Sequence, residues 1–284
     1  MSHLEGCRLV VTDLDGTLLD GRNYSFDPAR PALAALGERG IPLVLCSSKT
    51  RAEMEPLAAL LGLATPLIVE NGGALVFPAD MLPAPPAHAR RDGDRVVVPL
   101  GRPRAELLAA LPEVAGEAGV RARGFHQMTP QEVASLTGLT LEGAARALER
   151  EWDEPFVVEG PAGPGTEGDL GEAARRHGLR VTRGGRFHHL TGDSDKGKAL
   201  RTLLDLLPLA TLGQTVGLGD AANDLPLLRA VDRPILMPRE DGSVDPALAA
   251  ALPGAERAPA SGPRGWAEAI LAALEGKALS GVAS

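Results

Sequence analysis

The sequence has few cysteines, few aromatic residues and no excess of positive charge. Only Cys7 and Cys46 occur among 284 residues, without the number or spacing of a disulfide framework, a zinc site or a redox pair, so we expect a reducing cytoplasm. The 37 acidic and 29 basic residues give a net charge of −8, which argues against binding to nucleic acid or to an anionic membrane. Aromatic residues make up only 3%, so leucine, valine and alanine must form the core.

The sequence also lacks segments that would direct a chain to a membrane. Residues 1–6 contain no basic start followed by an apolar run, and no stretch approaches the roughly 20 apolar residues that span a bilayer. We therefore expect a soluble, intracellular protein. With 284 residues, 44% of them apolar, the chain is long enough for one large or two modest domains.

Strands and helices alternate in the first part of the chain. Residues 8–12 form a short β-branched run that stops at an acidic turn, which is typical of a buried parallel strand. Thr50, with Glu53 three residues later, forms a capping box that predicts the start of a helix. The expected elements are strands at 8–12, 42–46 and 67–69 and helices at 28–39 and 50–62. Strands separated by helices in this way predict right-handed crossovers and a parallel sheet covered on both faces.

The pattern changes after the turn at Asn71-Gly72-Gly73. Residues 78–91 are rich in proline and alanine, as linkers are, and about a hundred further residues alternate strand and helix candidates of a second α/β unit. From Asp195 the first pattern resumes, so the simplest topology inserts one domain into another. We predict a doubly wound, Rossmann-like parallel-sheet core of residues 1–84 and 191–284 with an inserted α/β cap of residues 85–190. The cleft between them is the expected ligand site.

Two carboxylates follow directly on the first strand, in the segment Asp13-Leu14-Asp15-Gly16-Thr17. In a doubly wound sheet, the loops beyond the carboxyl ends of the strands form the ligand crevice. Asp13 and Asp15 can both turn toward one centre there, as an oxygen-coordinated magnesium ion and an electrophile require. An ordinary Asp-Gly turn with two solvated carboxylates is the alternative interpretation.

A second acid-rich turn, Gly219-Asp220-Ala221-Ala222-Asn223-Asp224, follows a later strand of the same sheet. Asp220 alone could be the N-cap of the next helix. Two such turns at two strand ends, however, concentrate three or four negative charges in one crevice. A divalent cation resolves that repulsion.

Lys196 and the pair Ser47-Ser48 supply groups that can hold an anion. The serines follow the second strand and offer a hydroxyl and backbone N–H groups. Lys196 opens the helix after the insertion, where a single lysine could equally be a surface residue. Residues 192–198 also have the spacing of a nucleotide-binding loop, but Ala199 stands where a serine or threonine should hold magnesium, so we exclude that loop.

Together these segments resemble the four motifs of the haloacid dehalogenase superfamily of phosphatases, and the resemblance covers nearly the whole chain. It implies that Asp13 is the nucleophile that takes the phosphoryl group and that Asp15 is the general acid and base. It implies phosphate binding by Ser47, Ser48 and Lys196, magnesium binding by Asp13, Asp15 and Asp220, and a supporting role for Asn223 and Asp224. The physical chemistry agrees, because a carboxylate can approach a phosphate dianion only when cations neutralise the charge.

Four further segments resemble a branch of this superfamily, the mannosyl-3-phosphoglycerate phosphatases. They are residues 68–73, 150–156 and 184–189 and the segment Gly262-Pro263-x-Gly265-Trp266. The resemblance implies hydrolysis of a small phosphorylated sugar acid, mannosyl-3-phosphoglycerate, beneath a cap that excludes water. A carboxylate, a phosphate and a sugar call for cations and hydrogen-bonding groups. The candidate substrate-binding residues are Glu70, Asn71, Gly72, Gly73, Gln127, Thr129, Arg150, Glu151, Asp153 and Arg186.

Several alternatives stay open at this point. Each candidate in the cap could instead belong to an exposed helix end or a charged surface, and Phe125 and Met128 are expected in the cap core. A related phosphatase of glucosyl-3-phosphoglycerate or hexose phosphates, or a phosphomannomutase, would share the motifs. A signalling receiver also accepts phosphate on an aspartate, but receivers lack the inserted domain.

Overall fold

The computed structural model describes residues 6–82, 84–160, 163, 165–184, 187–207 and 213–279. The chain divides into two compact units: a core unit of Met1–Ser47, Leu63–Leu67 and Lys196–Ser284, and a second unit of Ser48–Gly62 and Ile68–Asp195. The second unit starts earlier along the chain than the predicted cap of 85–190. The reason is local, since α2 (Arg51–Leu60) packs against α5 (Leu141–Ala147), and β4 (Ala74–Pro78) pairs with β6 (Arg95–Pro99).

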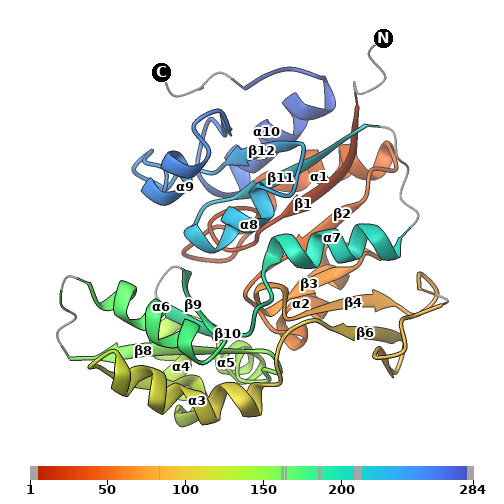
Figure 1. The fold of residues 1–284 in the computed structure, drawn as a ribbon. Coiled ribbons are helices and arrows are strands. Elements are labelled where there is room, and N and C mark those ends of the chain that lie inside the picture. Colours follow the sequence, from red (N-terminus) through yellow and green to blue (C-terminus); the bar gives the residue numbers. More distant parts are fainter. Residues whose placement is uncertain are drawn as a thin grey trace. The chain divides into compact units, whose positions relative to one another are not determined.

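A parallel sheet forms the centre of the core unit (Figure 1). Among the described residues, its strands lie in the order β13-β12-β11-β1-β2, and each neighbouring pair is parallel. Leu9, Val10 and Val11 of β1 are each at most 1% exposed, because both faces of the strand are covered. The predicted α/β class and parallel core sheet are confirmed. The bounds are β1 (Cys7–Thr12), β2 (Leu43–Cys46), β11 (Gln214–Gly219), β12 (Arg233–Leu236) and β13 (Glu256–Arg257).

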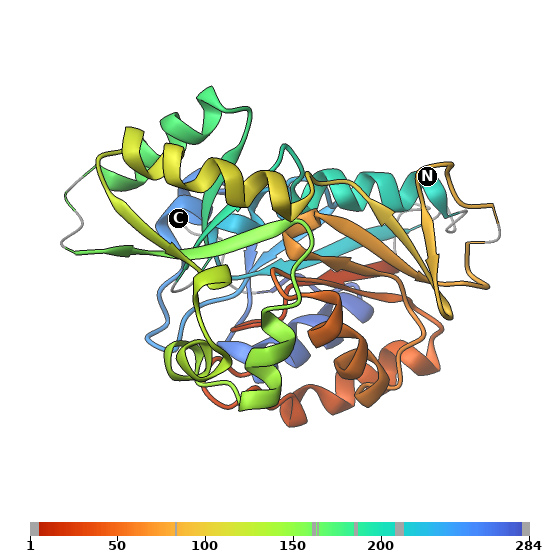
Figure 2. The same ribbon diagram turned by 90° about the horizontal axis from the view of Figure 1, so that it is seen from below.

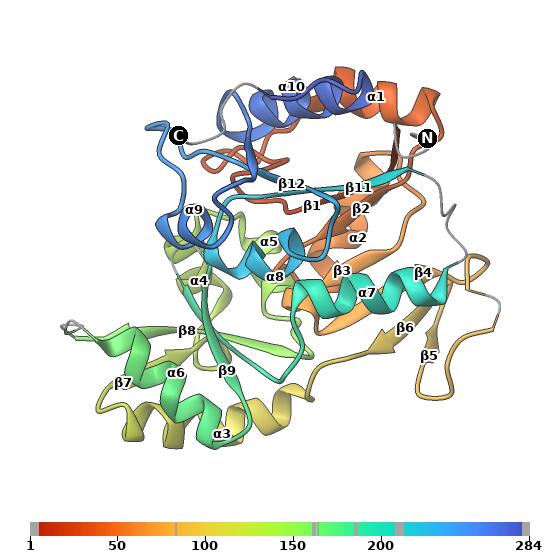
Figure 3. The same ribbon diagram turned by 45° about the horizontal axis from the view of Figure 1, so that its top comes forward.

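Helices cover both faces of the core sheet (Figure 3). The helices α1 (Arg30–Glu38) and α10 (Gly262–Leu274) lie side by side on one face, and α7 (Lys196–Leu206) and α8 (Leu225–Leu228) on the other. The fully buried Trp266 and Ile270 of α10 pack into the core. Short elements complete the unit: η1 (Asp27–Ala29), η4 (Ala222–Asp224) and α9 (Pro246–Ala251).

An antiparallel sheet with the strand order β7-β8-β10-β9 lies in the second unit. Its strands are β7 (Arg121–Gly124), β8 (Asp153–Glu159), β9 (Arg180–Gly184) and β10 (Phe187–Thr191). Side chains alternate across it, so that Phe156 packs under α3 (Arg104–Glu117) and α6 (Thr166–Arg176), whereas Val157 packs under α4 (Pro130–Thr137) and α5. Figure 2 shows α3 and the α4–α5 pair on opposite sides of these strands.

The remaining elements of the second unit are α2, the antiparallel strands β4, β6 and β5 (Arg90–Asp92), and the 3-10 turns η2 (Glu70–Gly72) and η3 (Phe125–Gln127). The strand β3 (Leu67–Val69) leads into η2. The predicted capping box is present, because Thr50 Oγ1 accepts from Glu53 N at 3.2 Å and Thr50 N donates to Glu53 Oε2 at 2.9 Å. In the part of the chain that the structure describes, no helix is long and apolar enough to cross a membrane.

Candidate active site

The candidate site lies at one edge of the core sheet. Asp13 follows β1, Ser47 follows β2, and Asp220 follows β11. These strands are parallel, so their carboxyl ends meet at the same edge. Asp13 N donates to Leu218 O at 3.0 Å, which ties the loop after β1 to the end of β11. The two acid-rich turns therefore lie side by side.

Lys196 joins the two turns. It is the first residue of α7, and its Nζ donates to Asp13 Oδ1 at 2.7 Å and to Asp224 Oδ1 at 2.5 Å. Only 1% of Lys196, 6% of Asp13 and 0% of Asp224 are exposed. Burial works to lower the pKa of Lys196, but Asp13 and Asp224 together raise it well above its ordinary value. Lys196 is therefore a buried cation and not a surface residue.

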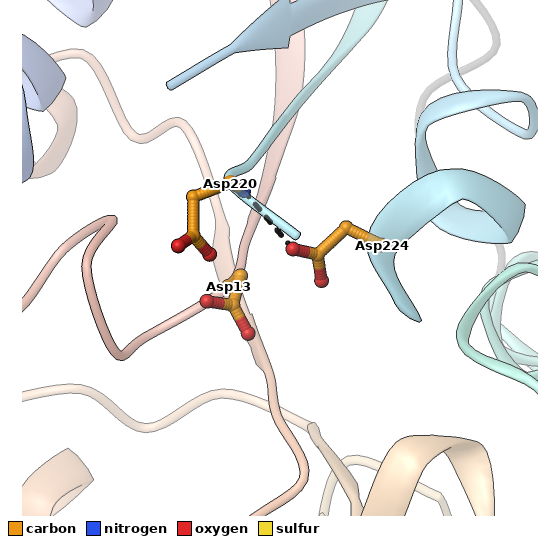
Figure 4. A group of neighbouring side chains, drawn as sticks. All are labelled: Asp13, Asp220 and Asp224. Atoms are coloured by element: carbon orange, nitrogen blue, oxygen red, sulfur yellow. Dashed lines mark hydrogen bonds between the residues drawn. The ribbon is translucent and has the colours of Figure 1, made fainter. Parts of the chain in front are cut away.

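Asp220 and Asp224 have different surroundings although they belong to the same turn. Asp224 Oδ2 accepts hydrogen bonds from the backbone N–H groups of Asp220 at 3.0 Å and Ala221 at 3.1 Å, while its Oδ1 accepts from Lys196. Figure 4 shows the carboxylate of Asp220 directed toward that of Asp13. The protein thus anchors Asp224 at both oxygens, whereas Asp13 and Asp220 present carboxylate oxygens to each other.

Burial and mutual repulsion raise the pKa values in this cluster. Burial of Asp13, together with the charge of Asp224, raises the pKa of Asp13 to about 7, although Lys196 acts in the opposite direction. Burial, followed by the charges of Asp13 and Asp224, raises the pKa of Asp220 well above its ordinary value. Further positive charge at this place lowers both pKa values and favours the ionised carboxylates, so the cluster is electrostatically suited to a cation.

The chemistry of the donors fits a hard divalent cation. One oxygen each of Asp13, Asp220 and Asp224 lie within 4.8 Å of one another. Carboxylate oxygens are the ligands that magnesium and calcium prefer. Because Asp224 already accepts hydrogen bonds at both oxygens, Asp13 and Asp220 are the better placed direct ligands.

The loop after β1 is closed by its own backbone. Leu19 N donates to Leu14 O at 2.8 Å, and Gly16 N donates to Leu19 O at 2.9 Å. Gly16 has a φ of +79°, and a Cβ at this position would lie 2.9 Å from Asp220 Oδ2. A Cβ here would displace the Asp220 carboxylate, and the positive φ favours glycine as well. Asp15 is half-buried in this loop.

A second group of candidate residues lies in the second unit. Glu70 and Asn71 both have left-handed backbones, with φ of 48° and 57°. Glu70 is 1% exposed, and its carboxylate accepts the N–H groups of Glu151 at 3.0 Å and Trp152 at 2.8 Å. Asn71 Nδ2 donates to Asp153 Oδ2 at 2.9 Å. The turn after β3 is thereby tied to the start of β8.

Asp153 is fully buried and gathers several donors besides Asn71. His189 Nδ1 lies 2.8 Å from Asp153 Oδ2, and Arg150 Nη1 lies 3.3 Å from the same oxygen. Burial works to raise the pKa of Asp153, but His189 and Arg150 outweigh it, so the pKa is lowered. Arg150 also donates to Ser48 O at 3.1 Å. An exposed charged surface is therefore the wrong interpretation for Arg150 and Asp153, which form an internal network; their contact with substrate stays a prediction.

The other candidates of the second unit have local partners. Gln127 is exposed, and its Oε1 accepts from Gly124 N at 3.0 Å. Thr129 is the N-cap of α4 and pairs with Glu132 in a capping box. Glu151 forms an ion pair with Arg90.

The predicted Asn71-Gly72-Gly73 turn has a steric requirement. A Cβ on Gly73 would lie 2.4 Å from Trp152 Cβ, so the backbone of this turn touches the start of β8. Phe125 and Met128 belong to the apolar cluster under α4 and α5, as expected for cap core. Arg186 lies outside the described residues.

Three residues without a predicted role, His189, Thr12 and Trp266, belong to the hydrogen-bond networks around these groups. His189 lies on β10, and nothing in the sequence around it indicates its bond to Asp153. Thr12 has the pattern of an ordinary β-branched strand residue, and Trp266 belongs to the segment Gly262-Pro263-x-Gly265-Trp266, whose pattern indicates no chemistry. The one available signal is that Trp266 is one of two tryptophans in a chain poor in aromatic residues.

Comparisons with known proteins identify the family. The haloacid dehalogenase-like hydrolases match residues 10–81. The chain is 39% identical over 264 residues to the glucosyl-3-phosphoglycerate/mannosyl-3-phosphoglycerate phosphatase of Methanococcoides burtonii, which covers 93% of this chain and 96% of the relative. It is 36% identical over 225 residues to the mannosyl-3-phosphoglycerate phosphatase of Pyrococcus furiosus, with coverage of 79% and 88%. The sucrose-phosphatase of Synechocystis, solved with sucrose and phosphate, has the same fold with a TM-score of 0.60 at 19% identity, over 95% of this chain and 98% of that one.

The chain belongs to the haloacid dehalogenase-like hydrolases. Within that family it is a phosphatase, and it resembles the mannosyl-3-phosphoglycerate phosphatases over most of its length. The resemblance inferred from the sequence motifs is confirmed.

Proposed function

We propose that the protein hydrolyses the phosphomonoesters of mannosyl-3-phosphoglycerate and glucosyl-3-phosphoglycerate through an aspartyl-phosphate, releasing phosphate and the glycosylglycerate. One observation carries the proposal: buried Asp13 lies 2.7 Å from Lys196 at the sheet edge that also holds Asp220. The substrate follows from the relative that is named for both compounds and is 39% identical over 93% of this chain.

In the first half-reaction, a carboxylate oxygen of Asp13 attacks phosphorus and forms a P–O bond, while the bond from phosphorus to the glycerate oxygen breaks. Asp15 gives a proton to that leaving oxygen. In the second half-reaction, Asp15 takes a proton from water, which attacks the aspartyl-phosphate and frees phosphate. Lys196 offsets the negative charge throughout, which suits its buried position between two carboxylates.

Asp13 and Asp220 are the proposed ligands of a magnesium ion, with Asp15 at the same site. When bound, magnesium supplies positive charge that offsets the repulsion between the carboxylates and a phosphate dianion. Asp224, fixed by Lys196 and two backbone N–H groups, supports Asp220, and the adjacent Asn223 belongs to the same turn. Ser47, Ser48 and Lys196 are the proposed phosphoryl-binding residues.

The residues of the second unit divide by their surroundings. Gln127 and Thr129 are exposed, and a sugar hydroxyl that contacts them would share or replace their present bonds to Gly124 N and Glu132. Glu70, Asn71, Arg150 and Asp153 are internal and act by holding the turn after β3 against β8. Gly72, Gly73, Glu151 and Arg186 complete the set of proposed substrate-binding residues.

The test is release of phosphate, with magnesium, from mannosyl-3-phosphoglycerate, glucosyl-3-phosphoglycerate and simple hexose phosphates. We expect the two glycosyl phosphoglycerates to have a kcat/KM about 100-fold or more above that of the hexose phosphates. The carboxylate and the sugar of these two substrates would add contacts with the protein in the transition state. Equally slow turnover of all compounds defeats the substrate assignment, and return of the phosphoryl group to another sugar oxygen would identify a mutase.

The mechanism is tested with Asp13→Asn, with Asp205→Asn as the matched control on the exposed side of α7. Acid quenching during single turnover should trap phosphate on the wild-type protein and on Asp205→Asn. Asp13→Asn should neither turn over nor carry phosphate, because the amide is not a nucleophile. Phosphate bound to the Asp13→Asn protein would contradict the assignment of the nucleophile.

A further inference from the structure

The segment Gly262-Pro263-x-Gly265-Trp266 has no role in the chemistry described above, yet its tryptophan reaches the end of β1. Trp266 is 0% exposed, and its Nε1 donates to Thr12 Oγ1 at 2.9 Å. Thr12 is also 0% exposed, and its hydroxyl donates to the backbone oxygen of Asp13 at 2.7 Å. A two-step hydrogen-bond chain therefore runs from α10 to the peptide of Asp13.

The hydrogen-bond chain from Trp266 through Thr12 completes the anchoring of the Asp13 backbone. Its N–H donates to Leu218 O at 3.0 Å, and its C=O accepts from Thr12 Oγ1. Both polar groups of the Asp13 backbone are thus held by buried partners, and the side chain leaves the backbone toward Lys196. A shift of this peptide would move the carboxylate away from its ammonium partner.

The indole also decides the direction of the hydrogen bonds. A tryptophan N–H can only donate, whereas a threonine hydroxyl has one hydrogen and two lone pairs. With one lone pair of Thr12 Oγ1 occupied by Trp266, the hydroxyl hydrogen is directed to the free acceptor beside it, the carbonyl of Asp13. Without the indole, the hydroxyl is free to rotate, and the carbonyl loses a defined donor.

Two glycines at the start of α10 allow the chain to pass close to the preceding segment. A Cβ on Gly265 would lie 1.6 Å from Ala260 O, and Gly262 has a φ of +60°. The first turn of α10 therefore requires glycine at Gly265, for space, and favours it at Gly262, for its positive φ. Ala258 N donates to Leu236 O at 2.9 Å, which fixes the same segment to the end of β12.

We propose that Trp266, acting through Thr12, is a positioning residue for the nucleophile Asp13. The inference rests on the proposed function, since it assumes that the Asp13 carboxylate attacks phosphorus. A displacement of a reacting group by about 1 Å can cost about 100-fold in rate, so a fixed peptide is of direct value to the phosphoryl transfer.

The test uses Trp266→Phe, which removes the indole N–H, and Thr12→Val, which replaces the hydroxyl by a methyl group of similar size. Each should lower kcat by about 10-fold to 100-fold and leave KM within about 2-fold, because the interaction orients the attack and does not bind substrate. The double variant should be no slower than the slower single variant, since both substitutions interrupt the same hydrogen-bond chain. Thr12→Ser keeps the hydroxyl and should restore most of the activity.

Ile270→Val is the matched control, since Ile270 is fully buried on the same helix, one turn after Trp266, and takes no part in the hydrogen-bond chain. It should lower the thermal midpoint as the other variants do while keeping kcat. If Asp13→Asn is inactive, the proposed function stands, and a normal kcat in both Thr12→Val and Trp266→Phe then overturns the inference. Additive losses that merely follow the loss of thermal stability, as measured with Ile270→Val, overturn it as well. An active Asp13→Asn would instead remove the proposed function, and the inference with it.

Discussion

Lys196 Nζ lies 2.7 Å from Asp13 Oδ1, and both side chains are shut away from solvent. The two residues lie on either side of the inserted segment in the sequence, 183 residues apart, with Asp13 after β1 and Lys196 at the start of α7. Asp224 contacts the same ammonium, so one buried cation serves two buried anions. The site therefore depends on Lys196 for both its charge balance and its geometry.

Lys196→Met should be inactive and less stable. Loss of the ammonium removes charge stabilisation worth about 100-fold to 1,000-fold in kcat. It also leaves Asp13 and Asp224 buried without their cation, a change that costs about 3–5 kcal/mol in the free energy of unfolding. Urea unfolding and phosphate release measure the two effects. Arg201→Met, an exposed charge loss on the same helix, should change neither, and comparable damage there would point to the helix and not the ion pair.

Gly16→Ala should separate backbone strain from contact with the site. Gly16 and Gly40 have φ of +79° and +62°, so an alanine at either costs about 1–2 kcal/mol of stability. Only at Gly16 would the new Cβ meet Asp220, whereas nothing lies within 4 Å at Gly40. We expect Gly16→Ala to lose about 100-fold in kcat and to need more magnesium, while Gly40→Ala keeps its activity. Magnesium titration of the two variants in parallel checks this, and identical curves would refute it.

Glu70→Gln should change how stability depends on pH. Burial raises the pKa of Glu70 from 4.5 to about 7, although Arg150 and the Trp152 N–H act against it. Because the folded protein then holds this proton longer than the unfolded chain, the Glu70 carboxyl lowers stability as the pH rises from about 4.5 to about 7. Glu70→Gln removes that loss, so its unfolding free energy relative to the wild type should rise by up to about 3 kcal/mol over this range.

Urea unfolding at several pH values measures this difference, and Glu159→Gln is the control because Glu159 is exposed at the end of β8. The control should track the wild type at every pH. If the gap between Glu70→Gln and the wild type stays constant, the buried carboxyl does not titrate in this range.

Asp153→Asn distinguishes an internal network from a sugar-binding residue. Loss of the charge leaves His189 and Arg150 without their buried partner, so we expect a loss of about 3–5 kcal/mol in unfolding free energy. A residue that only contacts the sugar would instead raise KM at unchanged stability. Asp169→Asn, on the exposed side of α6, should do neither. Thermal unfolding and steady-state kinetics together decide between the two roles.

The sequence predicts strands correctly where apolar residues form short runs bounded by turns. The core strands β1 and β2 are short apolar runs rich in Val and Leu, so the predicted strands at 8–12 and 42–46 agree with the observed bounds within one residue. The strands β5 and β7 could not be predicted. Arg90–Asp92 are exposed and charged, and Arg121–Gly124 holds two arginines, so neither shows an apolar alternation.

For the site, the residue types and their order in the sequence predict which side chains take part. Which of them contact one another is known only from the structure. Nothing in the sequence indicates that Asp224 would share Lys196 with Asp13, since this depends on how the turn after β11 folds back. Thr129, predicted as a sugar-binding residue, is the N-cap of α4, a role that the spacing of Thr129 and Glu132 also indicates. Long-range pairs such as His189 with Asp153 have no local pattern at all.

The hydrogen bond between Trp266 and Thr12 spans 254 residues of sequence. During synthesis, the end of β1 leaves the ribosome 254 residues before the indole that secures its last peptide. A nascent or prematurely terminated chain without α10 would therefore carry the aspartate and still be a poor enzyme. Competence for phosphoryl transfer is in this way postponed until α10 has been synthesised and has docked on β1.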